Sequence, residues 1–278
     1  MAKSDFKIKF WGVRGSIPVP GATTAKYGGN TPCVEIRCGD KIIILDAGSG
    51  IRELGNVLMK EMPIEANILL SHLHWDHIQG FPFFTPAFCE ESKINLFAEK
   101  KLNKTFESLM NGQMMYPHFP IALGDLNAHI TFNEVEYGDE LNFGKVVIKT
   151  SRNNHTDGSI AFRIEYKGKA VVYATDTEHY ACVDPVLSKA AEGADYIIYD
   201  SMYSDDEYTG KVGMSRMGWG HSTWQEGIRL AKHAKIKNLI LFHHDPEHTD
   251  KMLDNILRAA KKEFKNTIAA YEGLEIYI

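Results

Sequence analysis

Three imidazoles and one carboxylate fall within six residues of this chain, at positions 72–77 with the sequence HLHWDH. They follow a short apolar run that suits a buried strand. Residues two apart in extended backbone project to the same side, so His72 and His74 point together, whereas the turn that follows brings Asp76 and His77 toward a second point. Imidazole and carboxylate ligands together suit Zn²⁺, Mn²⁺ or Fe²⁺. The segment therefore predicts a metal site at the end of a strand.

A site for two metal ions needs more ligands, and three further candidates come at the ends of strand-like runs. These are His155, Asp176 and His243, each of which is placed at or just after an apolar run. Ligands at strand ends are held on rigid supports, which a metal site requires. Taken singly, each would more often be a capping or surface residue. Taken together with residues 72–77, they favour a metal site.

The rest of the chain alternates between strand-like and helix-like patterns. Strands are predicted at 6–11, 33–37, 41–45, 66–71, 146–151, 159–166, 170–175, 196–200, 238–243 and within 267–278. Helices are predicted at 51–61, 101–110, 185–192, 223–234 and 251–264. Two sets of strands with helices between and after them indicate two sheets packed face to face under outer helices, an α/β sandwich of four layers, αββα. No linker divides the chain, so we expect one domain over residues 1–278.

Composition and charge exclude some classes of protein. The formal net charge is -5, which argues against a surface that is basic throughout and binds nucleic acid or anionic lipid everywhere. The first residues lack the apolar core of a signal peptide, and no apolar run approaches the roughly 18 residues needed to cross a bilayer. We therefore expect a cytoplasmic protein that does not enter a membrane.

The chain resembles the metallo-β-lactamase superfamily over nearly its whole length. The resemblance rests on HLHWDH and on Asp46 in the segment LDAG, which matches a first motif whose aspartate supports the metal site without contacting the ions. It implies a hydrolase with two divalent ions, zinc foremost, although the same ligands accept Mn²⁺ or Fe²⁺. The ligands that it implies are His72, His74 and His155 for one ion, Asp76, His77 and His243 for the other, and Asp176 as the bridge between them.

Within that superfamily, the segment GHST at 220–223 is similar to the end of the ribonuclease Z and phosphodiesterase branch. The resemblance implies that His221 is the general acid for the leaving oxygen, that Asp200 orients it, and that Asp76 helps to orient the attacking water, held as hydroxide by the two ions. Arg14 and Ser16, on the loop after the first strand, either reach a substrate phosphate or form a structural turn.

Ribonuclease Z carries a long arm that grips transfer RNA, between the positions matching His155 and Asp176. Here that interval leaves space for one hairpin and no arm. The closer resemblance is to armless bacterial members of the branch. We therefore predict a phosphodiesterase of small phosphodiesters, cyclic nucleotides or cyclic phosphates, that acts as a homodimer. The alternatives are a nuclease for RNA or single-stranded DNA, which the sequence favours less, and a metal-stabilised sensor module without catalysis.

Two long loops are expected to border the site, at 111–123 and 204–220. Tyr116, His118 and Trp219 lie in them, where aromatic side chains could stack on a nucleobase or simply pack. His244 and His248 follow the last predicted ligand and have no role assigned from the sequence.

Overall fold

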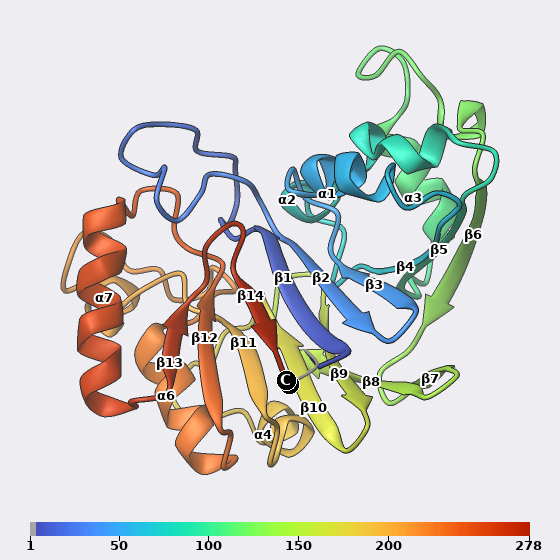
Figure 1. The fold of residues 1–278 in the computed structure, drawn as a ribbon. Helices are drawn as coiled ribbons and strands as arrows, with labels where there is room; N and C mark the ends of the chain where they lie inside the picture. The colour runs from blue at the N-terminus through green and yellow to red at the C-terminus, as the bar shows by residue number, and fades with distance from the viewer. Residues whose placement is uncertain (1–3) are drawn as a thin grey trace.

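Two seven-stranded β-sheets form the centre of the computed structural model, which describes residues 4–278 (Figure 1). The first sheet has the order β14-β1-β2-β3-β4-β5-β6. Its strands are β1 (Phe6–Gly12), β2 (Cys33–Cys38), β3 (Lys41–Leu45), β4 (Glu65–Leu69), β5 (Lys93–Glu99), β6 (His129–Val135) and β14 (Glu275–Tyr277). Residues 1–3 of the predicted domain lie outside the described residues.

The second sheet has the order β13-β12-β11-β10-β9-β8-β7. Its strands are β7 (Glu140–Phe143), β8 (Val146–Asn153), β9 (Ser159–Tyr166), β10 (Lys169–Ala174), β11 (Tyr196–Asp200), β12 (Asn238–Phe242) and β13 (Thr267–Ala269). The two sheets face each other across a hydrophobic core to which both contribute, with Phe10 and Ile36 from the first and Phe162 and Phe242 from the second.

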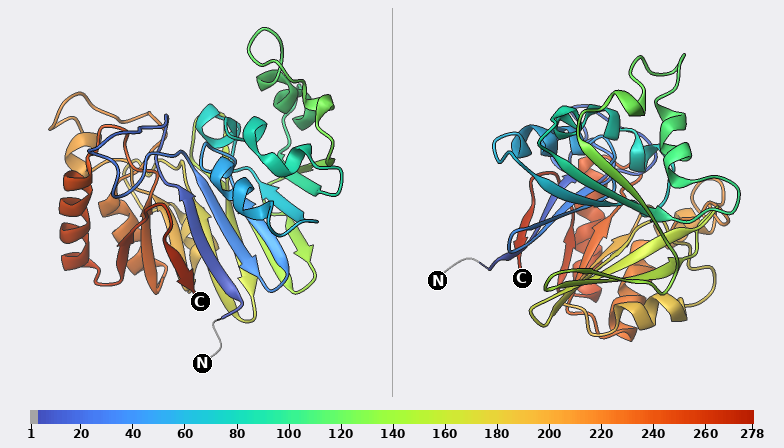
Figure 2. Two further views of the ribbon diagram at one scale, coloured as in Figure 1. Left: turned by 45° about the horizontal axis from the view of Figure 1, so that its top comes forward. Right: turned by 90° about the vertical axis from the view of Figure 1, so that its right-hand side faces the viewer.

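Helices cover the outer face of each sheet, as the two views in Figure 2 show. The helices are α1 (Ile51–Leu58), α2 (Trp75–Ile78), α3 (Phe106–Gln113), α4 (Pro185–Ala191), α5 (Asp205–Tyr208), α6 (Trp224–His233) and α7 (Asp250–Glu263), with short 3₁₀ turns at Phe81–Phe83, Thr85–Phe88 and Leu123–Asp125. Helices α1, α2 and α3 pack on the first sheet, and α4, α6 and α7 pack on the second. The predicted αββα sandwich is confirmed.

Strand direction decides where the site forms. Strands β3 and β4 are parallel neighbours in the first sheet, and β10, β11 and β12 are parallel neighbours in the second. Strand β8 runs in the same direction as β10 because both pair antiparallel with β9. The carboxyl ends of parallel strands meet at one edge, which is where open α/β sheets place their ligands. The residues after these strands therefore gather at one edge of the sandwich.

Some elements differ from the sequence predictions. Strands β5, β6 and β7 were not predicted, and α3 begins at Phe106 rather than at 101 because Thr105 caps it by accepting a hydrogen bond from Ser108 N. The final segment is two strands rather than one: β13 pairs with β12 in the second sheet, and β14 pairs with β1 in the first. The end of the chain therefore crosses from one sheet to the other.

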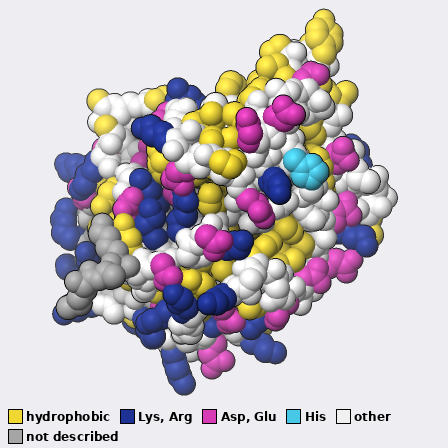
Figure 3. Space-filling model, turned by 45° about the vertical axis from the view of Figure 1, so that its right-hand side comes forward, with side chains coloured by type: hydrophobic (Ala, Val, Ile, Leu, Met, Phe, Trp, Pro, Cys, Tyr) yellow, Lys and Arg dark blue, Asp and Glu magenta, His cyan; other side chains and the backbone are white. Residues whose placement is uncertain are grey.

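The face drawn in Figure 3 carries acidic and basic side chains side by side, and it presents no continuous basic band. The segment between α3 and β6 projects from the molecule in Figures 1 and 2, and Met115 and Tyr116 in this segment are exposed. Among residues 4–278, no helix has the length and apolar character needed to cross a bilayer.

Candidate metal centre

All seven predicted ligands lie together at the edge of the sandwich where the parallel strands end. His72, His74, Asp76 and His77 follow β4, the last two on the short helix α2. His155 follows β8, Asp176 follows β10, and His243 follows β12. Both sheets therefore contribute, and the site sits across the gap between them.

One group of ligand atoms combines two imidazole nitrogens with two carboxylate oxygens at close spacing. His77 Nε2 lies 3.2 Å from Asp76 Oδ2 and 3.3 Å from Asp176 Oδ2, and His243 Nε2 lies 3.3 Å from each of the same two oxygens. Ligand atoms arranged as a tetrahedron about 2.0 Å from a zinc ion are separated by about 3.3 Å. The four nitrogen–oxygen distances in this group are thus those expected around one divalent ion.

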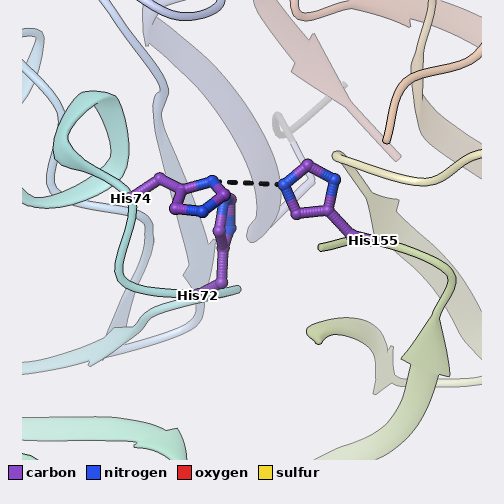
Figure 4. A group of neighbouring side chains, drawn as sticks. All are labelled: His72, His74 and His155. Atoms are coloured by element: carbon purple, nitrogen blue, oxygen red, sulfur yellow. Dashed lines mark hydrogen bonds between the residues drawn. The ribbon is translucent and has the colours of Figure 1, made fainter. Parts of the chain in front are cut away.

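A second group lies beside the first and shares Asp176. His72 Nε2 is 2.8 Å from His74 Nδ1, which is 3.2 Å from His155 Nε2 (Figure 4). Asp176 Oδ1 lies 3.7 Å from both His72 Nε2 and His155 Nε2. Because Oδ1 faces this group and Oδ2 faces the other, the carboxylate of Asp176 stands where a bridge between two ions would be.

The pKa values of three histidine ligands are shifted toward the form that binds metal, whereas that of His77 is shifted the other way. Burial lowers the pKa of His72, His74 and His155, so these imidazoles are neutral, the form that binds a metal ion. Burial also opposes charge on His77, but the carboxylates of Asp76, Asp176 and Asp46 outweigh it and raise the pKa of His77. The buried Nε2 of His77 makes no hydrogen bond of ordinary geometry within residues 4–278. A divalent ion would satisfy this nitrogen.

Asp46 supports the metal ligands through hydrogen bonds, without belonging to the ligand groups itself. It follows β3, is fully buried, and accepts hydrogen bonds from Ser71 N at 2.7 Å, Ser71 Oγ at 2.9 Å, His77 Nδ1 at 2.7 Å and Tyr173 OH at 2.6 Å. Since Ser71 Oγ donates to Asp46, it can accept from Nδ1 of His72 at 3.1 Å. Asp46 thus leaves Nε2 of His77, and through Ser71 Nε2 of His72, free to bind metal, as such buried carboxylates do in metal sites.

Three of these residues have left-handed backbone, with φ of 61° at Asp46, 53° at Asp176 and 58° at His243. Each comes directly or almost directly after a strand. Such backbone is unfavourable for residues other than glycine and concentrates at functional sites. It turns each side chain sharply out of its strand and toward the shared edge.

His221 lies next to Asp176, the proposed bridging ligand, and contacts the carboxylate of Asp200. Its Nδ1 lies 3.0 Å from Asp200 Oδ2 and 3.7 Å from Asp176 Oδ1, and its ring stacks on that of His243 with centroids 5.1 Å apart. Burial opposes protonation, but Asp200 outweighs it and raises the pKa of His221 to about 9. The other nitrogen, Nε2, has no hydrogen-bond partner within residues 4–278. His221 can therefore carry a proton at neutral pH and present it from Nε2.

Arg14 and Ser16 have other contacts than those considered from the sequence. Arg14 is fully buried, and its guanidinium donates to the carbonyl oxygens of Gly28, Asp245 and His248 at 2.9, 3.1 and 2.6 Å. Arg14 therefore stabilises the loop structure and does not face a space where it could contact a substrate phosphate. Ser16 acts through its backbone, whose N–H donates to Asp76 Oδ2 at 2.8 Å.

The segment 204–220 contacts the site in ways that the sequence pattern does not indicate. The carbonyl oxygen of Gly220 accepts a 2.7 Å hydrogen bond from Nδ1 of His155. Glu178, which is buried, accepts from Tyr208 OH at 2.6 Å, Gly218 N at 2.6 Å and Gly220 N at 2.9 Å. The only signal in the sequence is an acidic residue two positions after Asp176, which is too common to point to this contact.

The aromatic and histidine residues of the loops around the site differ in how far they are exposed to solvent. Tyr116 is 90% exposed and Trp219 is 49% exposed, while His118 lies on the same projecting segment as Tyr116. His244 is buried with Nε2 2.9 Å from the carbonyl oxygen of Ala270, and burial lowers its pKa to about 3. His248 is buried with Nε2 2.9 Å from Glu207 Oε1. His244 and His248 therefore support the fold around the site rather than facing its opening.

A cavity of about 580 Å³ opens beside His72 and His74. Its other walls come from the segment after β5, including Lys101 and Leu102, and from the turn between β8 and β9. The metal centre is therefore accessible from a space large enough for a small organic molecule.

Comparison with known proteins agrees with this geometry. The family described as the beta-lactamase superfamily domain matches residues 41–244, which contain all seven ligands together with Asp46, Asp200 and His221. The chain belongs to this superfamily. The metallo-β-lactamase fold implies divalent metal ions, and the expectation of a hydrolase in the ribonuclease Z-like branch is confirmed.

Individual members of the superfamily align with nearly the whole chain. A ribonuclease Z of Thermoplasma acidophilum is 22% identical over 98% of this chain and 96% of its own length. The metallo-beta-lactamase fold protein YhfI of Bacillus subtilis has a TM-score of 0.74 at 21% identity and covers 99% of both chains. A diphosphatase of the PhnP family has a TM-score of 0.72 at 16% identity and covers 98% of both chains. At these sequence identities, the likeness to YhfI and to the diphosphatase shows that they share the fold of this chain.

Proposed function

We propose that this chain is a phosphodiesterase that uses two divalent metal ions, with zinc as the first candidate. The observation that carries the proposal is the pair formed by His221 and Asp200 beside the ligand cluster. A phosphodiester releases an alkoxide, which needs a proton from a positioned acid. The ligand cluster alone would suit any hydrolysis of the superfamily, whereas a protonated histidine aimed at the site suits a poor leaving group.

The residues of the site have separate proposed roles in metal binding, proton donation and orientation. His72, His74, His155 and Asp176 would hold one ion, and Asp76, His77, His243 and Asp176 would hold the other. Bound ions would supply a water of lowered pKa and offset the charge of the phosphoryl group. Asp200 holds Nδ1 of His221, which fixes the ring and leaves the proton at Nε2 for the leaving oxygen. Ser16 N fixes Asp76, so that this carboxylate keeps one orientation.

RNA is the substrate class that the relatives support most directly. Two related proteins named ribonuclease Z, from Thermoplasma acidophilum and Picrophilus torridus, align with 98% and 99% of this chain. This support favours the nuclease over the small-molecule phosphodiesterase expected from the sequence. We therefore take RNA as the first candidate substrate.

Small phosphodiesters remain the second candidate because of one observation. The interval between His155 and Asp176 is filled by the β9–β10 hairpin, in which Lys169 pairs with Tyr166 across a tight turn. An arm that grips transfer RNA has no place there. A substrate that needs no such grip, such as a cyclic nucleotide, would suit this short hairpin.

Hydrolysis by metal-loaded protein tests the proposal. The panel comprises bis-p-nitrophenyl phosphate, 2′,3′- and 3′,5′-cyclic nucleotides, a short single-stranded RNA and nitrocefin, with metal content measured for each preparation. We expect cleavage of phosphodiesters and not of nitrocefin, with RNA and cyclic nucleotides ranked by kcat/KM. His74→Ala should abolish activity. Cleavage of nitrocefin alone, or of nothing by protein carrying two metal equivalents, would overturn the proposal.

The role of His221 has its own test. His221→Ala should lower kcat about 100-fold or more for an ester with an alkoxide leaving group, and much less for a p-nitrophenolate, which leaves without a proton. His233→Ala, at an exposed position on α6, is the matched control and should change neither. An equal loss for both leaving groups would show that His221 is not the acid.

A further inference from the structure

Arg216 stands out because, within residues 4–278, its charge is not paired with a carboxylate; its side-chain partner is the hydroxyl of Tyr203. No carboxylate lies within 4.0 Å of its guanidinium among residues 4–278, and its buried Nε makes no hydrogen bond. Its backbone is nevertheless well fixed, since Arg216 N donates to Tyr208 O at 3.0 Å and Trp219 N donates to Arg216 O at 3.1 Å. A structural arginine would ordinarily end on a carboxylate or on carbonyl oxygens, as Arg14 does on three carbonyls.

Two aromatic rings hold the Arg216 side chain instead. Its Cζ lies 5.3 Å from the ring centroid of Tyr203 and 4.8 Å from that of Trp219. Cation–π contacts of this kind restrict a guanidinium without neutralising it, and they leave its N–H groups available to a ligand. Trp219 is half exposed, whereas Tyr203 is buried. The guanidinium therefore sits between a fixed inner ring and an outer ring open to solvent.

The inner ring connects this arrangement to the proposed acid. Tyr203 meets His221 edge to face, with ring centroids 6.1 Å apart. Segment 204–220 also contacts the metal centre directly, through the hydrogen bond from His155 to Gly220 O. The cation of Arg216 and the exposed indole of Trp219 therefore lie next to Tyr203, the residue that contacts the ring of the proposed acid.

We propose that Arg216 and Trp219 form a subsite for one nucleotide unit on the leaving-group side of the scissile phosphodiester. Arg216 contacts phosphate oxygens, for which a planar guanidinium is well suited, and Trp219 stacks on the base. The inference rests on the proposed phosphodiesterase function. It requires a substrate with a phosphate and a base beyond the bond that is cut, which a strand of RNA has and a simple cyclic nucleotide lacks.

Kinetics on two substrates test the subsite. For a dinucleotide bearing a 3′-phosphate, we expect Arg216→Gln to raise KM about tenfold or more while kcat changes less than threefold. For a 3′,5′-cyclic nucleotide the same change should have little effect. Arg216→Lys, which keeps the charge, should recover part of the loss. Met214→Ala, in the same segment at an exposed position, is the matched control.

Binding to metal-loaded protein gives a second readout by isothermal titration calorimetry. Adenosine 3′,5′-bisphosphate should bind more weakly to Arg216→Gln and to Trp219→Leu, whereas inorganic pyrophosphate, which has no base, should be weakened by Arg216→Gln alone. Equal KM and equal binding in wild type and Arg216→Gln, at unchanged melting temperature, would overturn the subsite. If the wild type cleaves no phosphodiester, the proposed function fails instead, and the binding data still decide whether the subsite exists.

Discussion

The Nδ1 atom of His155 donates a 2.7 Å hydrogen bond to the carbonyl oxygen of Gly220. This contact joins a proposed metal ligand to the residue directly before the proposed acid. It leaves Nε2 of His155 for the metal, because a ring with its proton on Nδ1 has its lone pair on Nε2. The position of segment 204–220 and the orientation of the ligand are therefore coupled.

Gly220→Ala tests this coupling. Gly220 has a φ of 84°, and an added Cβ would collide with the imidazole of His155. We expect the affinity for one of two metal equivalents to fall about 10- to 100-fold, the range seen when the support of a ligand is lost. Gly218→Ala is the matched control, since Gly218 also has a φ of 84° but an added Cβ meets no atom within 4 Å. Equal metal affinity in the two variants would contradict the coupling.

Glu178→Gln tests what holds the segment. The carboxylate of Glu178 accepts three hydrogen bonds from residues 208–220, and an amide cannot replace all of them because one of its two ends is a donor. We expect the unfolding free energy to fall by about 1–3 kcal/mol. Amide hydrogen exchange should rise in 208–220 and stay unchanged in β10. Uniform changes across the protein would speak against a local anchor.

Asp46→Asn tests the support behind His77. The change removes the negative charge and turns one acceptor into a donor that faces either the N–H of Ser71 or the side-chain donors of His77 and Tyr173. We expect metal affinity to fall about 10- to 100-fold while all direct ligands remain. Asp40→Asn, at a side chain that is 87% exposed, is the control. Titration with a chromophoric chelator measures both, and an Asp46→Asn protein with wild-type affinity would rule out the supporting role.

Glu207 predicts how stability depends on pH. Burial alone would raise its pKa, but hydrogen bonds from His248 and from Ser204 outweigh burial and lower the pKa to about 2. A carboxylate with a lowered pKa stabilises the folded state above its ordinary pKa, and this contribution disappears as the pH falls toward about 2. Glu207→Gln should thus lower the melting temperature by about 2–6 °C at pH 7.

The pH profile of the Glu207→Gln variant provides the check. The difference in unfolding free energy between wild type and variant should be constant from pH 5 to 7 and shrink below the ordinary pKa of a glutamate, about 4.3. Glu247→Gln, which alters an acidic residue beside His248, serves as a comparison. A difference that does not change with pH would mean that the charge of Glu207 does not matter.

The sequence was sufficient to name the residues that gather at the site because their pattern is local. His72, Asp176 and His243 each follow a continuous apolar strand, and parallel strands bring their ends to one edge. Strand β6, which escaped prediction, lacks this signal. In β6, six of the seven residues are not fully buried, so the strand carries polar side chains on both faces. A sheet edge of this kind has no clear hydrophobic period.

The contacts missed at the site have a different cause. Glu178, Gly220 and Tyr173 act through hydrogen bonds to segments far away in the chain, and one of them acts through a backbone carbonyl that any residue would provide. Arg14 was considered as a phosphate ligand because arginine suits phosphate, but the fold closes the N-terminal loop over it. Residue type suggests chemistry, whereas burial depends on loops whose paths the sequence pattern does not describe.

The division of the metal centre between two sheets has a consequence for synthesis in the cell. Asp76 and His243, whose ligand atoms lie 3.3 Å apart, are separated by 167 positions in the chain. At about 5–20 residues per second, the ribosome makes the first of them roughly 10–30 s before the second. A nascent chain therefore contains the HLHWDH segment before His243 has been made. The second metal site becomes complete only when β12 packs into the sheet. Binding of both ions would then require the finished chain, and chains that stall before His243 would lack a complete site for the second ion.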